Sequence, residues 1–389
     1  MRVALISSRY PFPPWRGNQV RTVEWIEALS QHRLDIICPK PDGAARRDVA
    51  AEFHHYPLGL VSRAGSLLRA ALAGRPLQEG LYEGGPARRF VSDIIRASNP
   101  DVVIVQMVRC AWAGEAVEET NPSIPIVFDA IDAMGLHFER AAMNAAAPLA
   151  VAYRAEAARC RRRERAVVEK AQISVAVSQR DLEALEAPAG RGRVISVAGR
   201  EVQATSVEDS APIVLLSGNL GYRPTVKGAE WFAREIWPEV RKQVPAARWI
   251  MAGARPAPAI RRLGNLPGVE VHADVPDLGE YLGSARIAIA PMSSGSGVPM
   301  KVLEAMAAGV PAVVHPWAAE GLADGSDDAV AVASHPEDWI NCLADLLGDA
   351  GAARDLGERG RDLWRQHYHP DVVAGKIRQV VYDAADSAC

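Results

Sequence analysis

Lys301 and Glu304 lie near the start of a predicted helix, directly after a loop of serine and glycine at residues 293–297. Unpaired N–H groups and aligned peptide dipoles at a helix N-terminus attract anions, and glycine lets a phosphate approach the backbone closely. Lys301 would add a full positive charge. The carboxylate of Glu304 would repel a phosphate, but it can accept hydrogen bonds from a vicinal diol such as a ribose. The spacing therefore predicts a nucleotide site.

A strand, a helix and a second strand position these two side chains. Residues 287–291 are apolar and rich in β-branched side chains, as expected for a parallel strand covered on both faces. Pro299 has a φ already suited to a first helical turn, and Gly309 with Pro311 ends the helix before a second apolar run at residues 312–314. Val302 and Leu303 are expected to pack inward.

Two further loops have the layout of an anion site. Residues 2–7 read as a strand, and a proline-rich loop leads from it to Gly17, Asn18 and an amphipathic helix. Gly17 could equally well only end a surface loop. Residues 213–217 read as another strand, followed by Gly218 and, in or next to the loop, Arg223 and Lys227. Exposed loop cations often serve only solubility, so this second pattern is weak by itself.

Polar side chains follow two buried strands that the pattern predicts near residues 101–106 and 124–128. They are Gln106, Asp129 and Asp132. Ligands of open α/β sheets gather at the carboxyl ends of the strands. One of these side chains could therefore bind an acceptor molecule, although an aspartate after a strand is more often a helix cap.

Length and charge limit the function classes. A chain of 389 residues suits two domains, and a net charge of −3 argues against an electrostatically driven nucleic-acid binder. The sequence has no long apolar run and no signal peptide, and its five scattered cysteines lack metal-ligand spacing. A reducing cytoplasm and a site without metal are expected. The boundary between the domains is placed in the Gly- and Ala-rich residues 188–212.

Residues 154–170 form a basic, helix-compatible run, with seven arginines and lysines against three glutamates. Charged helix faces are common on solvated helices, which is the simpler interpretation. The sharper hypothesis is a basic surface that meets an anionic lipid-linked acceptor or the inner membrane leaflet.

The segment around Glu304 resembles the donor-site signature of GT4-family glycosyltransferases. The family motif LEAMA-x-G-x-P is matched by residues 303–307, Gly309 and Pro311. The resemblance implies that Glu304 holds the ribose hydroxyls. A second family glutamate normally stands eight positions earlier and contacts the donor sugar, but this chain has Ser296 there. Within the family, Tyr222, Pro224 and the pair Trp231–Phe232 resemble sugar transferases of exopolysaccharide loci.

This resemblance implies an α/β fold of the GT-B type, in which two Rossmann-like domains face each other across a cleft. The expected domains are an acceptor-side domain at 1–198, a nucleotide-sugar domain at 199–370, and a C-terminal helix at 371–389 that can cross back to the first domain. The Gly17 loop would approach the donor diphosphate, assisted by Arg16 or Arg21.

The same resemblance implies a retaining, metal-independent hexosyltransferase without a cofactor, with a UDP-sugar as the expected donor. The acceptor would be a glycan, a lipid-linked glycan or a natural product, bound on the side of Gln106, Asp129 and Asp132. The catalytic residues implied are Lys227, Arg223 and Glu304. The donor-binding residues implied are Gly17, Asn18, Gly218, Arg255, Ser296, Gly297, Val298, Lys301, Val302, Leu303 and Glu304.

Two rival functions were weighed. A dinucleotide-dependent dehydrogenase would need G-x-G-x-x-G after a strand, but Met300 occupies the place of the third glycine after Gly295 and Gly297. A noncatalytic nucleotide-sugar-binding protein with a degraded site is suggested by Ser296. Retention of Lys227, Lys301 and Glu304 favours the enzyme.

Overall fold

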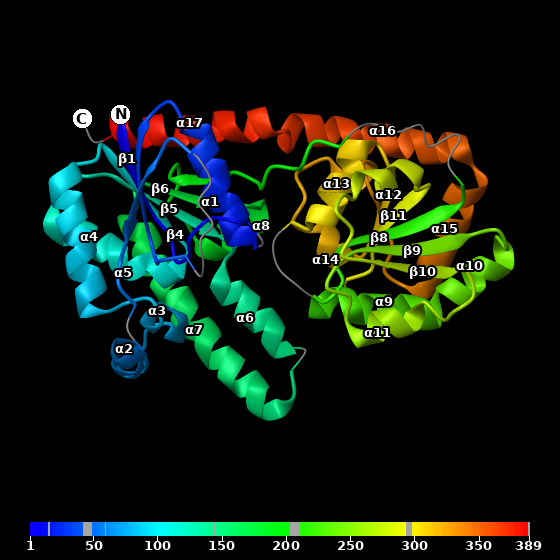
Figure 1. Ribbon diagram of the computed structural model, residues 1–389, viewed down its shortest axis with the longest axis horizontal. Helices are drawn as coiled ribbons and strands as arrows, with labels where there is room; N and C mark the ends of the chain where they lie inside the picture. The colour runs from blue at the N-terminus through cyan, green and yellow to red at the C-terminus, as the bar shows by residue number, and fades with distance from the viewer. Residues whose placement is uncertain are drawn as a thin grey trace. The chain divides into compact units, whose positions relative to one another are not determined.

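The computed structural model describes residues 1–14, 16–41, 49–58, 60–143, 145–202, 211–292 and 298–387, and of residues 60–64 only the backbone. The chain forms two compact units (Figure 1). Unit 1 comprises Met1–Val197 and Val373–Cys389, and unit 2 comprises Ala198–Val372. No helix among the described residues is long and apolar enough to cross a membrane.

Unit 1 is built on a parallel sheet with the strand order β3-β2-β1-β4-β5-β6-β7. Its strands are β1 (Arg2–Ile6), β2 (Arg33–Cys38), β3 (Glu52–His55), β4 (Val102–Gln106), β5 (Ile126–Ile131), β6 (Ile173–Ala176) and β7 (Gly192–Val194). The order reverses between β1 and β4, which is the arrangement of a doubly wound sheet. Apolar strands of this kind need cover on both faces, and the helices supply it.

The helices of unit 1 connect these strands. They are α1 (Gly17–Ala28), α2 (Leu60–Leu72), α3 (Leu77–Gly80), α4 (Gly85–Ser98), η1 (Val108–Cys110), α5 (Ala111–Thr120), α6 (Met134–Met143), α7 (Ala147–Lys170), α8 (Gln179–Leu185) and the C-terminal α17 (Pro370–Asp386). In α17 the Tyr382 hydroxyl lies 3.2 Å from His32 Nε2, and Arg378 donates to the Ala28 carbonyl at 3.4 Å. These contacts attach the last helix to the end of α1 and to the turn that follows it.

Unit 2 repeats the same topology in six strands, ordered β10-β9-β8-β11-β12-β13. The strands are β8 (Ile213–Asn219), β9 (Arg248–Ala254), β10 (Val269–Ala273), β11 (Ile287–Ala290), β12 (Ala312–Val314) and β13 (Ala331–Val332). The helices are α9 (Arg223–Glu235), α10 (Trp237–Gln243), α11 (Pro258–Leu263), α12 (Gly279–Ser284), α13 (Met300–Ala308), α14 (Pro316–Ala319), η2 (Ser326–Asp328), α15 (Pro336–Gly348) and α16 (Ala350–His367).

Both units therefore confirm the predicted α/β class with Rossmann-like sheets. The local structure differs from the prediction at the domain boundary. Strand β7 lies inside residues 188–212, where the composition predicted the boundary between the domains. The strand was not predicted because its short sequence has no apolar pattern. The segment after β8 forms two helices, since Pro238 has no N–H to continue α9 into α10.

A buried charge network joins α1 to the carboxyl ends of β4 and β5. Asp129 is fully buried and accepts hydrogen bonds from Arg21 Nε at 3.2 Å and from Trp25 Nε1 at 2.7 Å. Gln106 Nε2 also donates to Asp129, at 3.1 Å, and the side-chain oxygen Oε1 of Gln106 accepts from the Thr22 hydroxyl at 2.7 Å. Arg21 in turn donates to the Ser196 carbonyl.

This network corrects three expectations about unit 1. Gln106 and Asp129 were candidates for acceptor binding, but their side chains are enclosed and bonded to each other and to α1. Arg21 was expected near the donor diphosphate, but it is 0% exposed and its charge faces Asp129. Buried charges are tolerated only when they are paired, so these residues hold the sheet and α1 together.

Asp129→Ala should lower the stability of unit 1 strongly, by about 3–5 kcal/mol, because it leaves the Arg21 guanidinium buried opposite no carboxylate. Glu24→Ala is the matched control. Glu24 also pairs with Arg21, at 3.2 Å, but its loss leaves the contact with Asp129 intact, so we expect a shift of about 1 kcal/mol. Urea unfolding followed by circular dichroism measures both. Equal shifts for the two variants would contradict this account.

Candidate functional site

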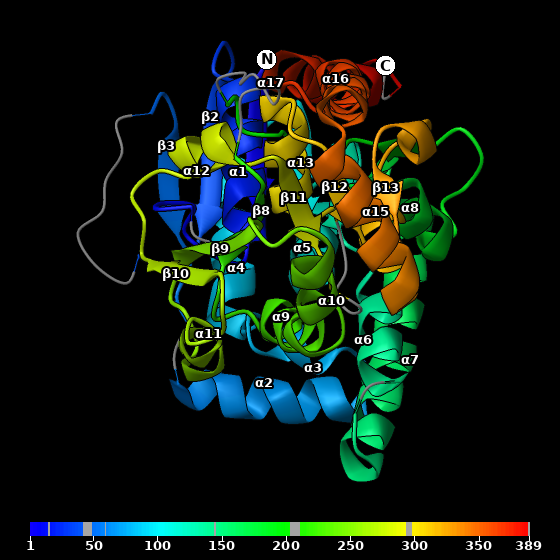
Figure 2. The ribbon, with the colours of Figure 1, turned by 90° about the vertical axis from the view of Figure 1, so that its right-hand side faces the viewer.

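Two helices of unit 2 begin where the strand order reverses, at the carboxyl ends of β8 and β11. They are α9, which follows β8, and α13, which follows β11 (Figures 1 and 2). Neither has an acidic residue in its first turn, and among the described residues no side chain caps either one. Pro224 has no N–H and the Val302 N–H bonds to the Pro299 carbonyl, but first-turn N–H groups such as those of Arg223 and Lys301 can serve an anion at the edge of the sheet where ligands of such folds bind.

The sulfur of Met292 connects the two helix starts. The buried Thr225 hydroxyl of α9 lies 3.6 Å from this sulfur, and the Lys301 ammonium of α13 lies 3.4 Å from it. Sulfur is a weak acceptor, so the contacts orient these groups without neutralising the lysine. A Cβ at Gly228 would lie 2.4 Å from the Pro291 carbonyl oxygen, so only glycine lets α9 pack this closely on the chain leaving β11.

Glycines also shape the neighbouring ends of β8 and β9. Gly218 and Gly253 are paired in the sheet, and a Cβ at Gly253 would lie 1.8 Å from the Gly218 carbonyl oxygen. Their φ angles of 105° and 151° are conformations that other residues rarely adopt. The nearest heavy atom to a Cβ at Gly218 would be Cε of Lys301, at 3.9 Å. The backbone here is open on the side where the lysine lies.

Lys301 and Glu304 form a half-buried pair of opposite charges one helical turn apart. Burial lowers the pKa of Lys301 to about 8, although Glu304 acts in the other direction. Burial also raises the pKa of Glu304, against the opposing influence of Lys301 and Arg200. In the part of the chain that the structure describes, neither charge has an oppositely charged group in a salt bridge with it. Such an arrangement is costly, and it is typical of groups that bind a charged or polar ligand.

Glu304 lines a pocket of 440 Å³. The other walls are residues 200–202 and the start of α12 with the residues before it, among them Asp277 and Gly279. The glutamate therefore does not point into bulk solvent, and its carboxylate can serve a ligand that enters this pocket. The volume is sufficient for a small polar molecule.

The cations predicted on α9 lie at its beginning. Arg223 is the first residue of the helix and Lys227 stands one turn later, so both share a face, and both are exposed. Arg255 directly follows β9 with a φ of 53°, and its N–H donates to Asp274 at 2.8 Å.

The remaining predicted donor residues differ in what the structure offers. Val298, Val302 and Leu303 are buried in the apolar core of unit 2, so only their backbone groups could face a ligand. Ser296 and Gly297 lie outside the described residues. Gly17 and Asn18 begin α1 in unit 1, and among the described residues beyond its chain neighbours none has a heavy atom within 4 Å of a Cβ built on Gly17.

Asp132 is the acceptor-side candidate that remains accessible. It stands half-buried between β5 and α6. Burial and the Asp181 carboxylate raise its pKa to about 7, while Arg109 acts in the opposite direction. It can therefore exchange a proton near neutral pH.

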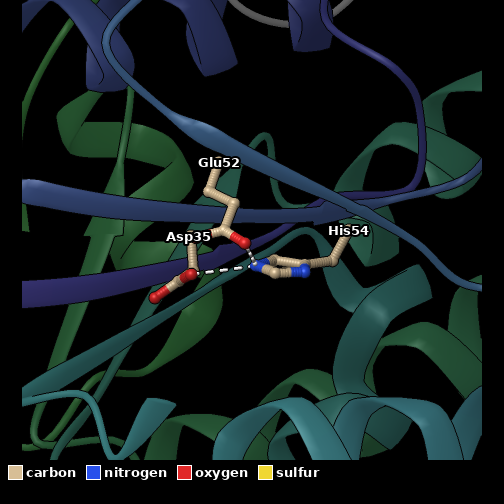
Figure 3. A group of neighbouring side chains, drawn as sticks. All are labelled: Asp35, Glu52 and His54. Carbon is tan, nitrogen blue, oxygen red and sulfur yellow. Dashed lines mark hydrogen bonds and ion pairs between the residues drawn. The ribbon is translucent and has the colours of Figure 1, made fainter. Parts of the chain in front are cut away.

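A separate group in unit 1 has the composition of a metal site. Asp35, Glu52 and His54 offer ligand atoms within 4.8 Å of one another (Figure 3). However, Arg2 donates to both oxygens of Asp35, at 2.7 and 3.2 Å, and His54 Nε2 lies 2.9 Å from one of them. Burial would raise the pKa of Asp35, but these hydrogen bonds outweigh it and lower that pKa. The group is satisfied as an ion pair between neighbouring strands.

Several features of the site were not predicted. The Met292 sulfur, the buried Thr225 and the Gly253 contact have no distinctive sequence signal, because each depends on a partner distant in the chain. Arg200 acts on Glu304 from the segment joining the units. Asn219 could have been recognised, since its side chain accepts from the Gly221 N–H in a local turn that Asn-Leu-Gly favours.

Comparison with known proteins agrees with this geometry. Residues 211–349 match the family model described as Glycosyl transferases group 1. Sucrose-phosphate synthase from Thermosynechococcus elongatus has a similar fold, with a TM-score of 0.74 and 15% identity over 100% of both chains. Anabaena HepE in complex with UDP-glucose gives a TM-score of 0.65 at 12% identity, covering 98% of this chain and 99% of that one. WaaG, a glycosyltransferase involved in lipopolysaccharide biosynthesis, gives 0.64 at 15% identity, covering 96% and 99%.

A relative by sequence is an exopolysaccharide phosphotransferase from Streptomyces coelicolor, 32% identical over 115 residues. The match covers 27% of this chain and 12% of the relative, so the chain spans only a small part of that protein's length. The fold is thus GT-B, as the resemblance implied, and residues 211–349 are the part of the chain that is similar to group 1 glycosyl transferases.

The pKa of Lys301 predicts how anion binding depends on pH. As the pH rises from 7 to 9 through a pKa of about 8, the ammonium is lost, and affinity for inorganic pyrophosphate should fall about tenfold. The variant Lys301→Arg stays charged over this range, so its profile isolates the titration of pyrophosphate itself. Isothermal titration calorimetry measures both. Parallel profiles for wild type and variant would contradict this role for Lys301.

Proposed function

We propose that the protein is a retaining GT4-type hexosyltransferase that moves a sugar from a UDP-sugar to an acceptor hydroxyl. The observation that carries this proposal is the meeting of two helix starts, α9 and α13, at the Met292 sulfur, with Lys301 between them and the open backbone of Gly218. Such a place suits a pyrophosphate, because it combines N–H groups, two helix dipoles and a lysine.

Each part of the donor has a counterpart. The pyrophosphate would lie at the starts of α9 and α13, where Lys301, Lys227 and Arg223 offer positive charge. The ribose would reach Glu304, whose carboxylate lines the neighbouring pocket and can accept from two hydroxyls. UDP is the expected nucleotide, and the complexes of Anabaena HepE with UDP-glucose and with UDP support this choice.

The proposed chemistry relies on fixed positive charge. As the bond to the leaving UDP breaks, negative charge grows on the β-phosphate, and Lys227, Lys301 and the helix N–H groups stabilise it. These donors make a metal ion unnecessary. In a retaining reaction the acceptor hydroxyl attacks on the face that the phosphate leaves. It gives its proton to a phosphate oxygen, so no side chain is assigned as general base.

The acceptor would be held by unit 1, with Asp132 as the accessible candidate. A glycan, a lipid-linked glycan or a natural product fits this reaction, and the match to an exopolysaccharide phosphotransferase favours a role in polysaccharide synthesis. We place the activity in the cytoplasm, at or near the inner face of the membrane.

A first test separates enzyme from binder. Purified protein should hydrolyse a UDP-sugar slowly without an acceptor, and Lys227→Ala should reduce this rate by about a hundredfold, as expected for removal of a charge on the leaving group. Lys242→Ala is the control, because Lys242 is also an exposed lysine of unit 2 and pairs with Glu239 on α10. Release of UDP is the readout. UDP binding without turnover would indicate a noncatalytic binding protein instead.

A second test concerns Glu304. Glu304→Gln should weaken UDP about tenfold, since a charged acceptor of ribose hydrogen bonds is lost, yet leave inorganic pyrophosphate unweakened. Glu358→Gln on α16 serves as the control for an exposed glutamate. Calorimetric titration with both ligands gives the comparison. Equal loss of UDP and pyrophosphate would place Glu304 at the phosphates and refute the assignment to ribose.

A further inference from the structure

Five of the seven basic residues of the run on α7 are paired with glutamates among the described residues, so the run as a whole is a weaker lipid-facing surface than its sequence suggested. Arg163 bonds to Glu79 and Glu115, each at 2.6 Å. Lys170 pairs with Glu118, Arg165 with Glu186, Arg161 with Glu139 and Arg159 with Glu156. The pair Arg159–Glu156 lies within α7, whereas the other pairs tie α7 to the elements around it. Paired charges are weakly attractive to an external anion.

Helix α2 presents a different surface. Leu68 is 62% exposed and Leu72 is 80% exposed, and their spacing of four residues puts them on one face of the helix. Leu77 and Leu81, which follow α2 in the chain, are also exposed. The opposite face of α2 is held by α3, since a Cβ at Gly80 would lie 2.9 Å from the Ala70 methyl. The exposed leucines of α2 therefore do not take part in its packing against the rest of unit 1.

The charges near this leucine face have one sign. Residues 60–78 contain no aspartate or glutamate. Arg69 is exposed and donates to the neutral Ser66 hydroxyl, so its charge is retained. The exposed Arg162 of α7 lies beside the end of α2, because its Nη1 would be 3.1 Å from a Cβ at Gly74. An apolar helix face bordered by arginines is typical of segments that lie on anionic membranes.

A second apolar group lies at the turn between α6 and α7. Met143 is 67% exposed, Leu149 45% and Val151 63%. In both views this turn and α2 project from the lower side of unit 1 (Figures 1 and 2). Two separate apolar groups on one side of a unit fit an extended, deformable surface such as a lipid bilayer better than they fit a single protein partner.

We propose that α2 and the α6–α7 turn dock unit 1 on an anionic lipid bilayer. Leu68 and Leu72 enter the interfacial region, and Arg69 and Arg162 contact the lipid phosphates. This inference deepens the acceptor assignment and rests on the proposed function only for its role, because a lipid-linked acceptor would be presented at such a surface. Vesicle binding itself requires neither donor nor acceptor.

Flotation with vesicles of phosphatidylcholine, with and without phosphatidylglycerol, tests the docking on the full chain. Wild type should float with the phosphatidylglycerol vesicles and be released by salt. The double variant Leu68→Ser/Leu72→Ser should lose binding about tenfold or more, because two exposed leucines no longer leave water. Leu266→Ser in unit 2, where Leu266 is 37% exposed, is the matched control and should bind as wild type does.

Three results would overturn the proposal. Wild type that stays with the soluble fraction has no lipid surface. Equal flotation of wild type and the double variant would place the contact elsewhere. A wild-type oligomer in gel filtration that becomes smaller in the double variant, without vesicle binding, would assign the leucines to a second copy of the chain. UDP release measured in parallel, without vesicles, shows whether the transferase assignment stands independently of the lipid result.

Discussion

The starts of α9 and α13, which no described side chain caps, are the feature on which the rest of unit 2 depends. A helix start needs partners for its first donors, and soluble proteins usually supply a Ser, Thr, Asp or Asn side chain. Here Tyr222 and Pro299 occupy the capping positions, and neither side chain makes a capping hydrogen bond. The dipole of each helix is therefore not compensated by a capping side chain, and its positive end lies at the edge of the sheet where the strand order reverses, between β8 and β11. An anion from outside the chain is the natural partner.

Close backbone packing fixes the distance between those two helix starts. The contacts of Gly228 with Pro291 and of Gly253 with Gly218 bring α9 and the ends of β8, β9 and β11 nearer than side chains would allow. The apolar residues of α13 then bind it to the sheet, while Lys301 and Glu304 emerge from the same helix on the ligand side. A rigid frame of this kind positions charge before the ligand arrives, which is the condition for electrostatic catalysis.

Local signals were sufficient for the fold class and for α13. Pro299 at the helix start, Gly309 at its end with a φ of 75°, and apolar strands on both sides are short-range features that one sequence displays directly. The cap of α8 is equally local, since the Ser178 hydroxyl accepts from the Asp181 N–H. The failures concern long-range partners. Gln106 and Asp129 have the sequence context of ligand-binding residues, and only the arrival of α1 from more than 80 residues away shows that Arg21 and Thr22 occupy their polar atoms.

The two units treat buried charge in opposite ways, and the contrast identifies the functional pair. Around Asp129 every partner comes from the chain itself, at hydrogen-bond distances, so the network is complete and its removal would affect stability. Among the described residues, the Lys301 ammonium makes one hydrogen bond, and its acceptor is the Met292 sulfur. Glu304 stands one turn away and lines a pocket. Burial lowers the pKa of Lys301 and raises that of Glu304, so it favours the neutral form of each group. The protein gains nothing from this unless a bound ligand restores the two charges. A diphosphate beside the lysine and a diol beside the glutamate would do so, and this complementarity makes the pair at the start of α13 a binding site and the Asp129 network a structural support.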